Sequence, residues 1–411
     1  MNVWVDLVGQ DRVVAQLRET VAAAVGVPRG EPASGMAHAW LYTGPPGCGR
    51  STAARAFAAA LQCSQQGCGE CGACRTVLAG TSADVEIVEA DLLSIAVADV
   101  RELVRRAALS PVGGRWQIII MADADRLTES AGNALLKAIE EPTPRTLWML
   151  CAPYIEDVLP TIRSRCRHVA LRTPRDTAVA DVLVHRDGVE PGLAITAARA
   201  AQGHIGRARR LATDEQARAR RTDVLRLALA LNDVARCLTA ARSLVDAAED
   251  EAKHITEELD TQETETLRTT LTGGAKRGLA TGGAGALKHL ESRQKKRATR
   301  LRRDALDRAL VDLTAFYRDV LAVQFGSRVE LVNDEIRDVI HQIAASSSPE
   351  ATLRRIDAIL ACRNAIEANV APLLAVEAMI LALRRREAEP ITSTLAGSSA
   401  TGPPQETPQD R

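Results

Sequence analysis

Short apolar runs alternate with amphipathic stretches over the first part of the chain. Four of these runs predict β-strands, at 40–42, 85–88, 116–121 and 147–150. Helical spacing is found at 52–61, 99–108 and 130–141, and Pro142 ends the last of these helices. Because the runs at 116–121 and 147–150 are almost entirely apolar, they predict buried strands of a parallel sheet that is covered by helices on both faces.

The pattern becomes helical from about Asp176 and stays so. Three stretches, 178–185, 193–202 and 207–212, predict a small helical domain. A further region, helical throughout, begins near Thr222. We therefore expect an α/β domain with a parallel sheet followed by two all-α parts, and 411 residues agree with about three domains.

A charged insertion interrupts this last region between about 249 and 305. One interpretation is an acidic and a basic helix that fold back on each other around a glycine turn and pair their charges. The other is a basic arm that contacts DNA phosphates. We favour the paired helices, because charges of opposite sign lie so close in sequence. The insertion consists of the acidic residues Glu249, Asp250, Glu251, Glu257, Glu258, Asp260, Glu263 and Glu265, the glycine-rich segment 273–285, and the basic residues Lys288, Arg293, Lys295, Lys296, Arg297, Arg300, Arg302 and Arg303.

Composition narrows the classes of function. Formal net charge is zero, so no global field attracts nucleic acid or membrane, and only a local patch could do so. Aromatic residues make up 2% of the chain, which suits helices packed through small aliphatic side chains. No apolar run is long enough to span a bilayer, and the first residues do not form a secretory signal. We therefore expect a cytoplasmic protein without a membrane partner, where clustered cysteines indicate metal ligands before disulfides.

A glycine-rich loop between the strand 40–42 and the helix 52–61 fits the phosphate-loop pattern. Its glycines let backbone N–H groups converge on phosphate oxygens, and the following helix presents its N-terminus to negative charge. A strand-to-helix turn that binds no nucleotide is the alternative. The candidate nucleotide-binding residues are Gly44, Gly47, Gly49, Arg50, Ser51 and Thr52 in this loop and helix, together with Asp123.

Two positions depart from an active ATPase of this kind. Arg50 stands where lysine is usual, and a bulky forked guanidinium does not replace a slim ammonium between phosphates. Asp123 can still hold magnesium, but Ala124 has no group to polarise the attacking water. Asp125 comes one residue later and would point to the other side of a continuing strand. Two independent defects predict that this site does not hydrolyse ATP.

Four cysteines lie within a dozen residues, at Cys63, Cys68, Cys71 and Cys74. Each C-x2-C pair places two thiolates on one tight turn, and four sulfurs complete a tetrahedral zinc site without an open position. Such a site is structural, not catalytic. An iron–sulfur cluster and a metal-free cluster are the alternatives, and the other five cysteines are expected to be ordinary buried side chains.

With these residues in hand, the chain resembles the clamp-loader subunits of bacterial DNA polymerase III, which are AAA+ proteins. The resemblance covers the first two domains well and the third only generically. It implies an AAA+ P-loop domain over 1–172 with a zinc knuckle at 63–74, a small helical lid over 173–221 and an all-α collar domain over 222–386. The segment 387–411 is rich in Pro, Ser, Thr, Gly and Gln, and this composition predicts a disordered tail. The motifs that carry the resemblance are Val8-Gly9-Gln10, the loop 44–51, the four cysteines, the run 133–142 with the sequence NALLKAIEEP, and Ser164-Arg165-Cys166.

Two branches of this family, the delta-prime and the tau/gamma subunits, differ at the two positions where this chain departs from an active ATPase. The resemblance implies that tau/gamma subunits keep the phosphate-loop lysine and a glutamate after the magnesium aspartate, whereas this chain has Arg50 and Ala124. Ala152 and Gly206 stand where the ATPase has polar sensor residues, although Arg207 is adjacent to the second position. The pattern therefore matches the delta-prime branch, with its own ATPase activity absent or very weak.

The resemblance also implies partners and one catalytic residue. Delta-prime is the rigid member of a ring with tau/gamma and delta subunits, which loads the sliding clamp onto primer–template DNA. Arg165 would act as an arginine finger towards ATP held by the neighbouring subunit, where a guanidinium neutralises charge on the transferred phosphoryl group. The alternatives are that Arg165 pairs with a carboxylate of its own chain, or that Arg163 or Arg167 takes the role.

Two other functions remain as alternatives. The first is an active clamp-loader ATPase of the tau/gamma type, which an ATPase assay on the isolated protein distinguishes. The second is a zinc-dependent DNA-binding module, in which the cysteine knuckle and the basic stretch 288–303 grip DNA. Zero net charge and the scarcity of aromatic residues for base stacking count against this second alternative.

Overall fold

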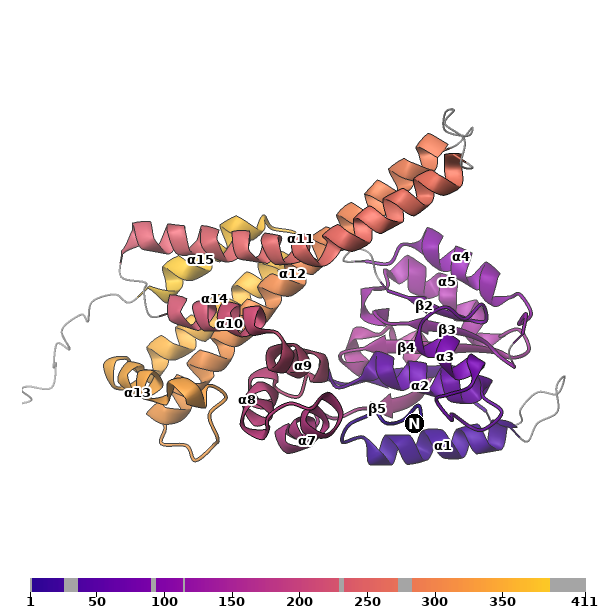
Figure 1. The fold of residues 1–411 in the computed structure, drawn as a ribbon, viewed down its shortest axis with the longest axis horizontal. Helices are drawn as coiled ribbons and strands as arrows, with labels where there is room; N and C mark the ends of the chain where they lie inside the picture. Colours follow the sequence, from indigo (N-terminus) through magenta and orange to yellow (C-terminus); the bar gives the residue numbers. More distant parts are fainter. Residues whose placement is uncertain are drawn as a thin grey trace, which may run out of the picture.

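A computed structural model describes residues 2–25, 36–89, 94–113, 115–228, 233–272 and 283–384. The predicted tail 387–411 and residues 273–282 of the glycine-rich segment 273–285 lie outside these residues. Within the described residues, no helix has both the length and the apolar character needed to cross a membrane. Figure 1 shows a sheet-containing half and a helical half, from which two long helices project together.

The first half is built on a sheet of five parallel strands in the order β2-β3-β4-β1-β5. The parallel sheet predicted from the sequence is thereby confirmed. The edge strand β5 was not predicted, because only one of its four residues is buried and it has no apolar run. The strands are β1 Ala39–Thr43, β2 Val85–Val88, β3 Gln117–Met121, β4 Thr146–Ala152 and β5 Arg167–Ala170.

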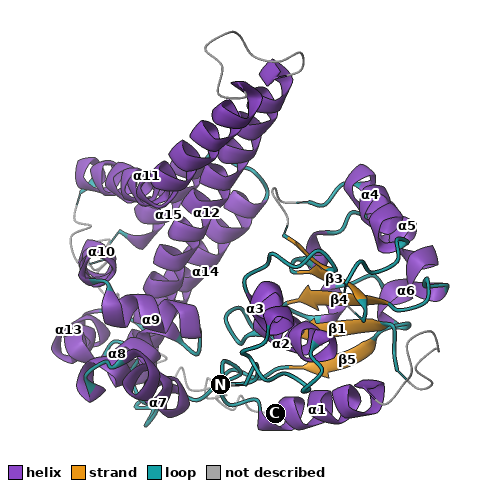
Figure 2. Ribbon diagram, turned by 45° about the vertical axis from the view of Figure 1, so that its right-hand side comes forward, coloured by secondary structure: helices purple, strands orange, loops and turns teal. Residues whose placement is uncertain are grey.

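Helices cover both faces of this sheet (Figure 2). Alternation along β1 sends Trp40 and Tyr42 into the core on one face and Leu41 into the core on the other. All three side chains are fully buried, so the sheet is the central layer of three. The first face carries α1 Asp11–Val25, α2 Arg50–Gln62 and α3 Gly72–Leu78, and the second carries α4 Val97–Ala107, α5 Glu129–Glu140 and α6 Pro160–Arg163.

The helical half contains two further hydrophobic cores. The smaller one is rich in alanine, which lets its three helices approach closely, and the helices predicted at 178–185, 193–202 and 207–212 fall within it. The larger one is formed by the remaining helices. The helices are α7 Asp176–Asp187, α8 Pro191–Ala201 and α9 Ile205–Thr213 in the first, and α10 Glu215–Leu227, α11 Val234–Thr272, α12 Gly283–Gln324, α13 Arg337–Ser346, α14 Pro349–Glu367 and α15 Pro372–Leu383 in the second.

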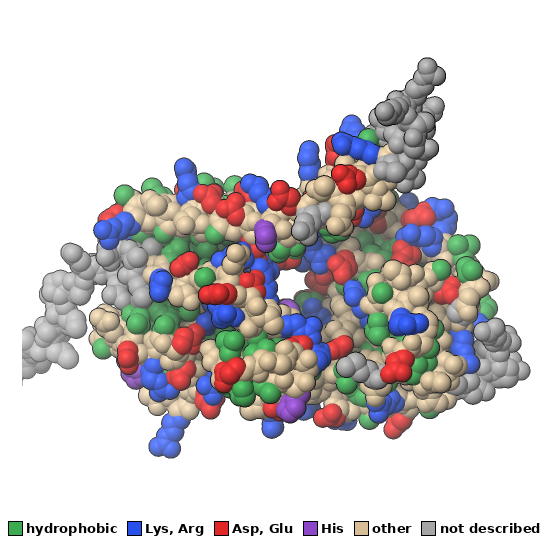
Figure 3. Space-filling model, viewed as in Figure 1, with side chains coloured by type: hydrophobic (Ala, Val, Ile, Leu, Met, Phe, Trp, Pro, Cys, Tyr) green, Lys and Arg blue, Asp and Glu red, His purple; other side chains and the backbone are tan. Residues whose placement is uncertain are grey.

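The charged insertion is a helical hairpin formed by extensions of α11 and α12. Arg297 of α12 forms ion pairs with Asp260 and Glu263 of α11, and Arg308 pairs with Glu251 at 2.6 Å. Basic and acidic side chains intermingle along this hairpin (Figure 3). The predicted pairing of an acidic with a basic helix is confirmed, but the two helices continue unbroken into the larger helical core instead of forming a separate unit.

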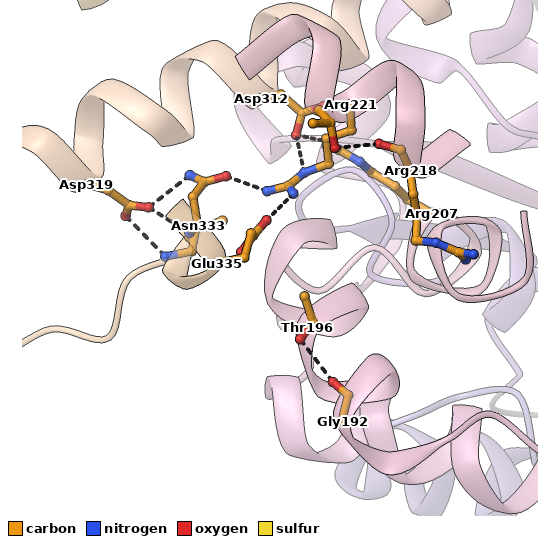
Figure 4. Close-up of polar contacts among 11 residues, drawn as sticks. Gly192, Thr196, Arg207, Arg218, Arg221, Asp312, Asp319, Asn333 and Glu335 are labelled. Carbon is orange, nitrogen blue, oxygen red and sulfur yellow. Dashed lines mark hydrogen bonds and ion pairs between the residues drawn. The ribbon is translucent and has the colours of Figure 1, made fainter. Parts of the chain in front are cut away.

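A buried carboxylate joins the small helical core to α12. Asp312 on α12 accepts from Arg207 on α9 and from Arg221 on α10, and Arg221 also contacts Asn333 and Glu335 (Figure 4). Burial raises the pKa of Asp312, and the two guanidinium groups oppose that rise. A buried charge is tolerated only when it is paired in this way, so these contacts hold α9 against α12.

Candidate nucleotide site and cysteine cluster

The predicted phosphate loop connects the carboxyl end of β1 to the first turn of α2. Gly49 immediately precedes α2 with φ +98°, and Gly47 has φ +83°, a backbone region that side chains other than glycine rarely adopt. A Cβ on Gly44 would come within 2.6 Å of the Leu171 carbonyl oxygen. The loop therefore requires its glycines, and it brings Arg50, Ser51 and Thr52 to the N-terminus of a helix, where anions are favoured.

Asp123 lies at the same edge of the sheet, because the carboxyl ends of parallel strands meet there. Together with Arg50 and Asp125 it lines a cavity of about 320 Å³, so the structure brings the predicted loop and the predicted magnesium ligand together. The chain leaves β3 at Met121 and turns into a short 3₁₀ helix, Ala124–Arg126. The position of Asp125 is therefore not set by strand alternation, and burial raises the pKa of its carboxyl.

The two departures from an active ATPase have visible consequences. Nη1 of Arg50 donates a hydrogen bond to the carbonyl oxygen of Gly44, so the guanidinium is engaged by the first residue of its own loop. Ala124, in the position expected to polarise water, is 2% exposed and offers only a methyl group. The loop keeps the backbone shape of a phosphate loop. Its cation, Arg50, hydrogen-bonds to a backbone carbonyl, and the methyl group of Ala124 occupies the position where an active ATPase has its catalytic base.

His204 closes over the loop from the small helical core, and sequence reasoning assigned it no role. A Cβ on Gly47 would meet the His204 ring at 2.2 Å, so the imidazole packs directly on the loop backbone. Nδ1 of His204 accepts the N–H of Arg207 at 3.2 Å and caps α9. Burial of the ring and the positive charge of nearby Arg207 lower the pKa of His204. The ring is therefore neutral, and its Nδ1 can accept this hydrogen bond. No spacing in the sequence indicates this contact, because it depends on how α9 docks.

Arg165 does not line the cavity of its own chain. It follows α6, and Nη2 lies 2.6 Å from Oε1 of Glu140, at the end of α5. Nη1 donates to the Thr161 carbonyl oxygen at 2.9 Å and to the Ser164 hydroxyl at 3.2 Å. The intrachain pairing considered as an alternative is thus present, but both side chains are more than 40% exposed and such pairs contribute little. The guanidinium remains accessible to a ligand outside the chain.

The other two candidate arginines are placed differently from Arg165. Arg167 lies in β5, with its guanidinium carbon 5.0 Å from the centre of the Trp40 ring. That stacking on the aromatic face assigns Arg167 a packing role. Arg163 is the last residue of α6.

The four predicted metal ligands form one cluster. All four sulfur atoms of Cys63, Cys68, Cys71 and Cys74 lie within 4.8 Å of one another. The Cys63–Cys68 and Cys63–Cys71 sulfur separations are both 3.7 Å, and sulfurs about 2.3 Å from a tetrahedral zinc ion lie about 3.8 Å apart. The cluster could therefore hold a metal ion with the dimensions of a zinc site. Cys63 belongs to it despite the longer spacing to the next cysteine.

Backbone N–H groups favour the thiolate form of Cys63, whereas burial raises the pKa of Cys74 in the same cluster. The N–H groups of Gln65, Cys71 and Cys74 donate to the sulfurs of Cys63, Cys68 and Cys71 at 3.3–3.4 Å. Burial acts to raise the pKa of Cys63, but the N–H groups of residues 65, 67 and 68 outweigh it and lower the pKa to about 6. The 13 residues of α2, about 20 Å of helix, separate the cluster from the phosphate loop, so the two sites are chemically independent.

Two family profiles match the chain, and together they cover more than half of it. The profile described as "DNA polymerase III, delta subunit" matches residues 32–175, and "DNA polymerase III, delta subunit, C terminal" matches residues 299–385. The DNA polymerase III subunit gamma/tau of Mycobacterium tuberculosis is 36% identical over 174 residues, which are 41% of this chain and 28% of that protein. The DNA polymerase III subunit delta' of Pseudomonas aeruginosa is 34% identical over 165 residues, 39% of this chain and 50% of that protein.

Among solved structures, the overlap with RuvB of Thermotoga maritima has 19% identity and a TM-score of 0.37, covering 61% of this chain and 77% of that one. An overlap with so low a TM-score assigns neither a fold nor a function to this chain. The parallel sheet, the phosphate loop and the helical parts that follow define a P-loop protein of the AAA+ type. With the profiles and relatives just described, the chain belongs to the clamp-loader family of DNA polymerase III subunits. It spans half or less of the length of those two relatives.

Proposed function

We propose that this chain is a delta-prime-type clamp-loader subunit, whose own nucleotide site does not hydrolyse ATP. The observation that carries the proposal is a phosphate loop in which Arg50 replaces lysine and hydrogen-bonds to Gly44, beside an Asp123 that is followed by the apolar Ala124. Arg207, adjacent to the position of a second sensor, is directed to Asp312 on α12 and is therefore engaged away from the loop. Arg50 and Arg207 are thus each engaged by groups of this chain.

In this proposal Arg165 is the residue that takes part in catalysis, at the ATP site of a neighbouring tau/gamma subunit. Its exposed guanidinium does not line the chain's own cavity, and its partners among the described residues are Glu140 and two weaker acceptors. A phosphoryl group that develops negative charge would compete with Glu140 for this cation. Arginine fingers supplied in trans act in this way.

The proposed partners are tau/gamma and delta subunits in a ring, and through that ring the sliding clamp and primer–template DNA. The helical region 222–386 would join the ring as a collar, after an AAA+ domain over 1–172 and a lid over 173–221. The separate hydrophobic cores of the sheet region, the small helical region and the larger helical bundle support three parts, but α10 Glu215–Leu227 crosses the boundary at 221/222 and packs in the larger bundle. Zinc is the proposed structural cofactor, held by the four cysteines.

Replacing Arg50 by alanine is expected to leave ATP hydrolysis and clamp loading of the reconstituted complex within about twofold of wild type. The reason is that Arg50 bonds to the loop carbonyl of Gly44 and is not proposed to contact nucleotide that is hydrolysed; loss of this charged hydrogen bond costs about 1.5–3 kcal/mol of stability. The measurement is clamp-stimulated phosphate release by the complex with tau/gamma and delta subunits. A loss of tenfold or more would mean that nucleotide held at this loop matters after all, as in the alternative of an active tau/gamma-type ATPase.

A zinc-dependent DNA-binding module is less well supported. Within the hairpin, Arg297, Arg302 and Arg308 of α12 pair with acidic residues of α11, which leaves fewer charges for phosphates. Binding of duplex DNA by the isolated chain that is tight and falls steeply with salt would favour this alternative.

A further inference from the structure

Arg300 of the basic stretch contacts the sheet-containing half, in addition to Asp304 on its own helix, whose Oδ2 lies 4.0 Å from its Nε. Arg300 of α12 reaches across to the sheet, where Nη1 lies 3.2 Å from Oε2 of Glu89 and Nη2 lies 3.9 Å from Oδ2 of Asp123. Glu89 directly follows β2, and Asp123 follows β3, which is the neighbouring strand. A guanidinium from the helical half therefore lies between two carboxylates at the carboxyl edge of the sheet.

The helical half also forms one wall of the candidate nucleotide cavity. Pro46, Arg50, Asp123 and Asp125 line it from the sheet side, and residues of α12 and α14 line it from the other side. Figure 3 shows the molecule hollowed between the helical bundle and the sheet-containing half. Two other cations of this wall are engaged elsewhere, since Arg303 donates to Asn369 and Arg363 pairs with Asp307. Arg300 thus connects α12 to Asp123.

We propose that Arg300 is an internal latch, which takes the place of a magnesium ion beside Asp123 and fastens α12 across the mouth of the phosphate-loop cavity. Mg²⁺ requires close oxygen ligands in octahedral geometry, and a guanidinium whose Nη2 lies 3.9 Å from Oδ2 of Asp123 places a positive charge that repels Mg²⁺ from that carboxylate. The latch therefore has two effects: it excludes Mg²⁺-nucleotide from this chain, and it fixes the helical half to the sheet-containing half. This inference goes beyond the proposed role of Arg165 and does not depend on it.

The latch is tested by hydrogen–deuterium exchange on the purified full chain. In Arg300→Ala, amides of 122–126 and of α12 around 297–304 are expected to exchange about fivefold faster or more, because a contact between the two halves is lost. Glu89→Gln, which weakens the same contact from the sheet side, is expected to act in the same direction. The matched control is Arg302→Ala, because Arg302 has the same exposure as Arg300 but pairs with Glu249 of α11. Exchange in 122–126 that is unchanged in both test variants would overturn the latch.

Exclusion of nucleotide is tested on the same proteins with a fluorescent ADP analogue and Mg²⁺. Arg300→Ala is expected to bind it about fivefold more tightly than wild type or more, and Arg302→Ala is not. The gain should vanish in Arg300→Ala/Asp123→Ala, since Asp123 is the carboxylate that the latch covers. Equal affinity in wild type and Arg300→Ala would overturn the exclusion. Neither readout uses ATP hydrolysis by a complex, so failure here is distinguishable from failure of the proposed function.

Discussion

Replacing Arg165 by alanine is expected to slow ATP hydrolysis at the adjoining site of the reconstituted clamp loader by about a thousandfold or more, as for other arginine fingers. The physical reason is that, in the proposed role, the exposed guanidinium would contact a phosphoryl group of the neighbouring subunit's ATP and neutralise the negative charge that develops there. The ring itself should still assemble, because Arg165 contributes only a surface ion pair with Glu140 to its own fold. The measurement is phosphate release with clamp and primer–template DNA present, after assembly has been verified by size.

Arg163→Ala is the matched control for Arg165, since Arg163 lies two residues away at the end of α6. It should leave the hydrolysis rate within about twofold of wild type, a change too small to indicate a group that contacts the transition state. If Arg165→Ala assembled normally and hydrolysed ATP at the wild-type rate, the finger would not be Arg165. If Arg163→Ala slowed ATP hydrolysis instead, Arg163 would be the arginine finger.

If the four-cysteine cluster holds zinc as proposed, replacing Cys71 by serine is expected to release that ion and to destabilise the sheet-containing half by several kcal/mol. A structural zinc site contributes its binding free energy to folding, and loss of one of four ligands removes much of it. Cys63 and Cys74 are buried in the core that also holds Trp40 and Phe57, so the damage should spread into that core. The measurements are metal analysis, with about one zinc per wild-type chain, and thermal unfolding with and without a chelator.

Cys166→Ala provides the comparison for the zinc experiment, because Cys166 is half-buried and lies outside the four-sulfur cluster. It should keep the metal, with only the modest loss of stability that a small packing change brings. A wild-type protein that carries no metal would refute the zinc proposal. Iron with the colour of a cluster would support the iron–sulfur alternative in its place.

The sequence indicated those parts of the structure that depend on local pattern. Apolar runs predicted β1 to β4, and the cysteine spacing predicted a cluster whose sulfurs the structure places within 4.8 Å of one another. Glycine at 44, 47 and 49 predicted the loop before α2, since the backbone there excludes side chains. The helix α1 and the strand β5 were not predicted, and β5 lacks the apolar run that identifies a strand.

Contacts between distant segments could not be obtained in this way. His204 packs on Gly47 across more than 150 residues, and Arg300 reaches Glu89 across more than 200. The basic stretch was expected to pair with the acidic one, which is correct for Arg297 but not for Arg300. The charge pattern of the sequence predicts that an arginine will pair with a carboxylate. Which carboxylate it reaches depends on how the helical half packs against the sheet-containing half.

If the loop 44–51 has the backbone of a phosphate loop but does not support hydrolysis, the purified chain alone should not turn over ATP. We predict that, with Mg²⁺ and saturating ATP, the wild-type protein releases phosphate no faster than its Asp123→Ala variant, which lacks the remaining magnesium ligand. Steady turnover on the order of one ATP per second by the wild-type chain, abolished by Asp123→Ala, would contradict the account and assign the protein to the active ATPases of its family.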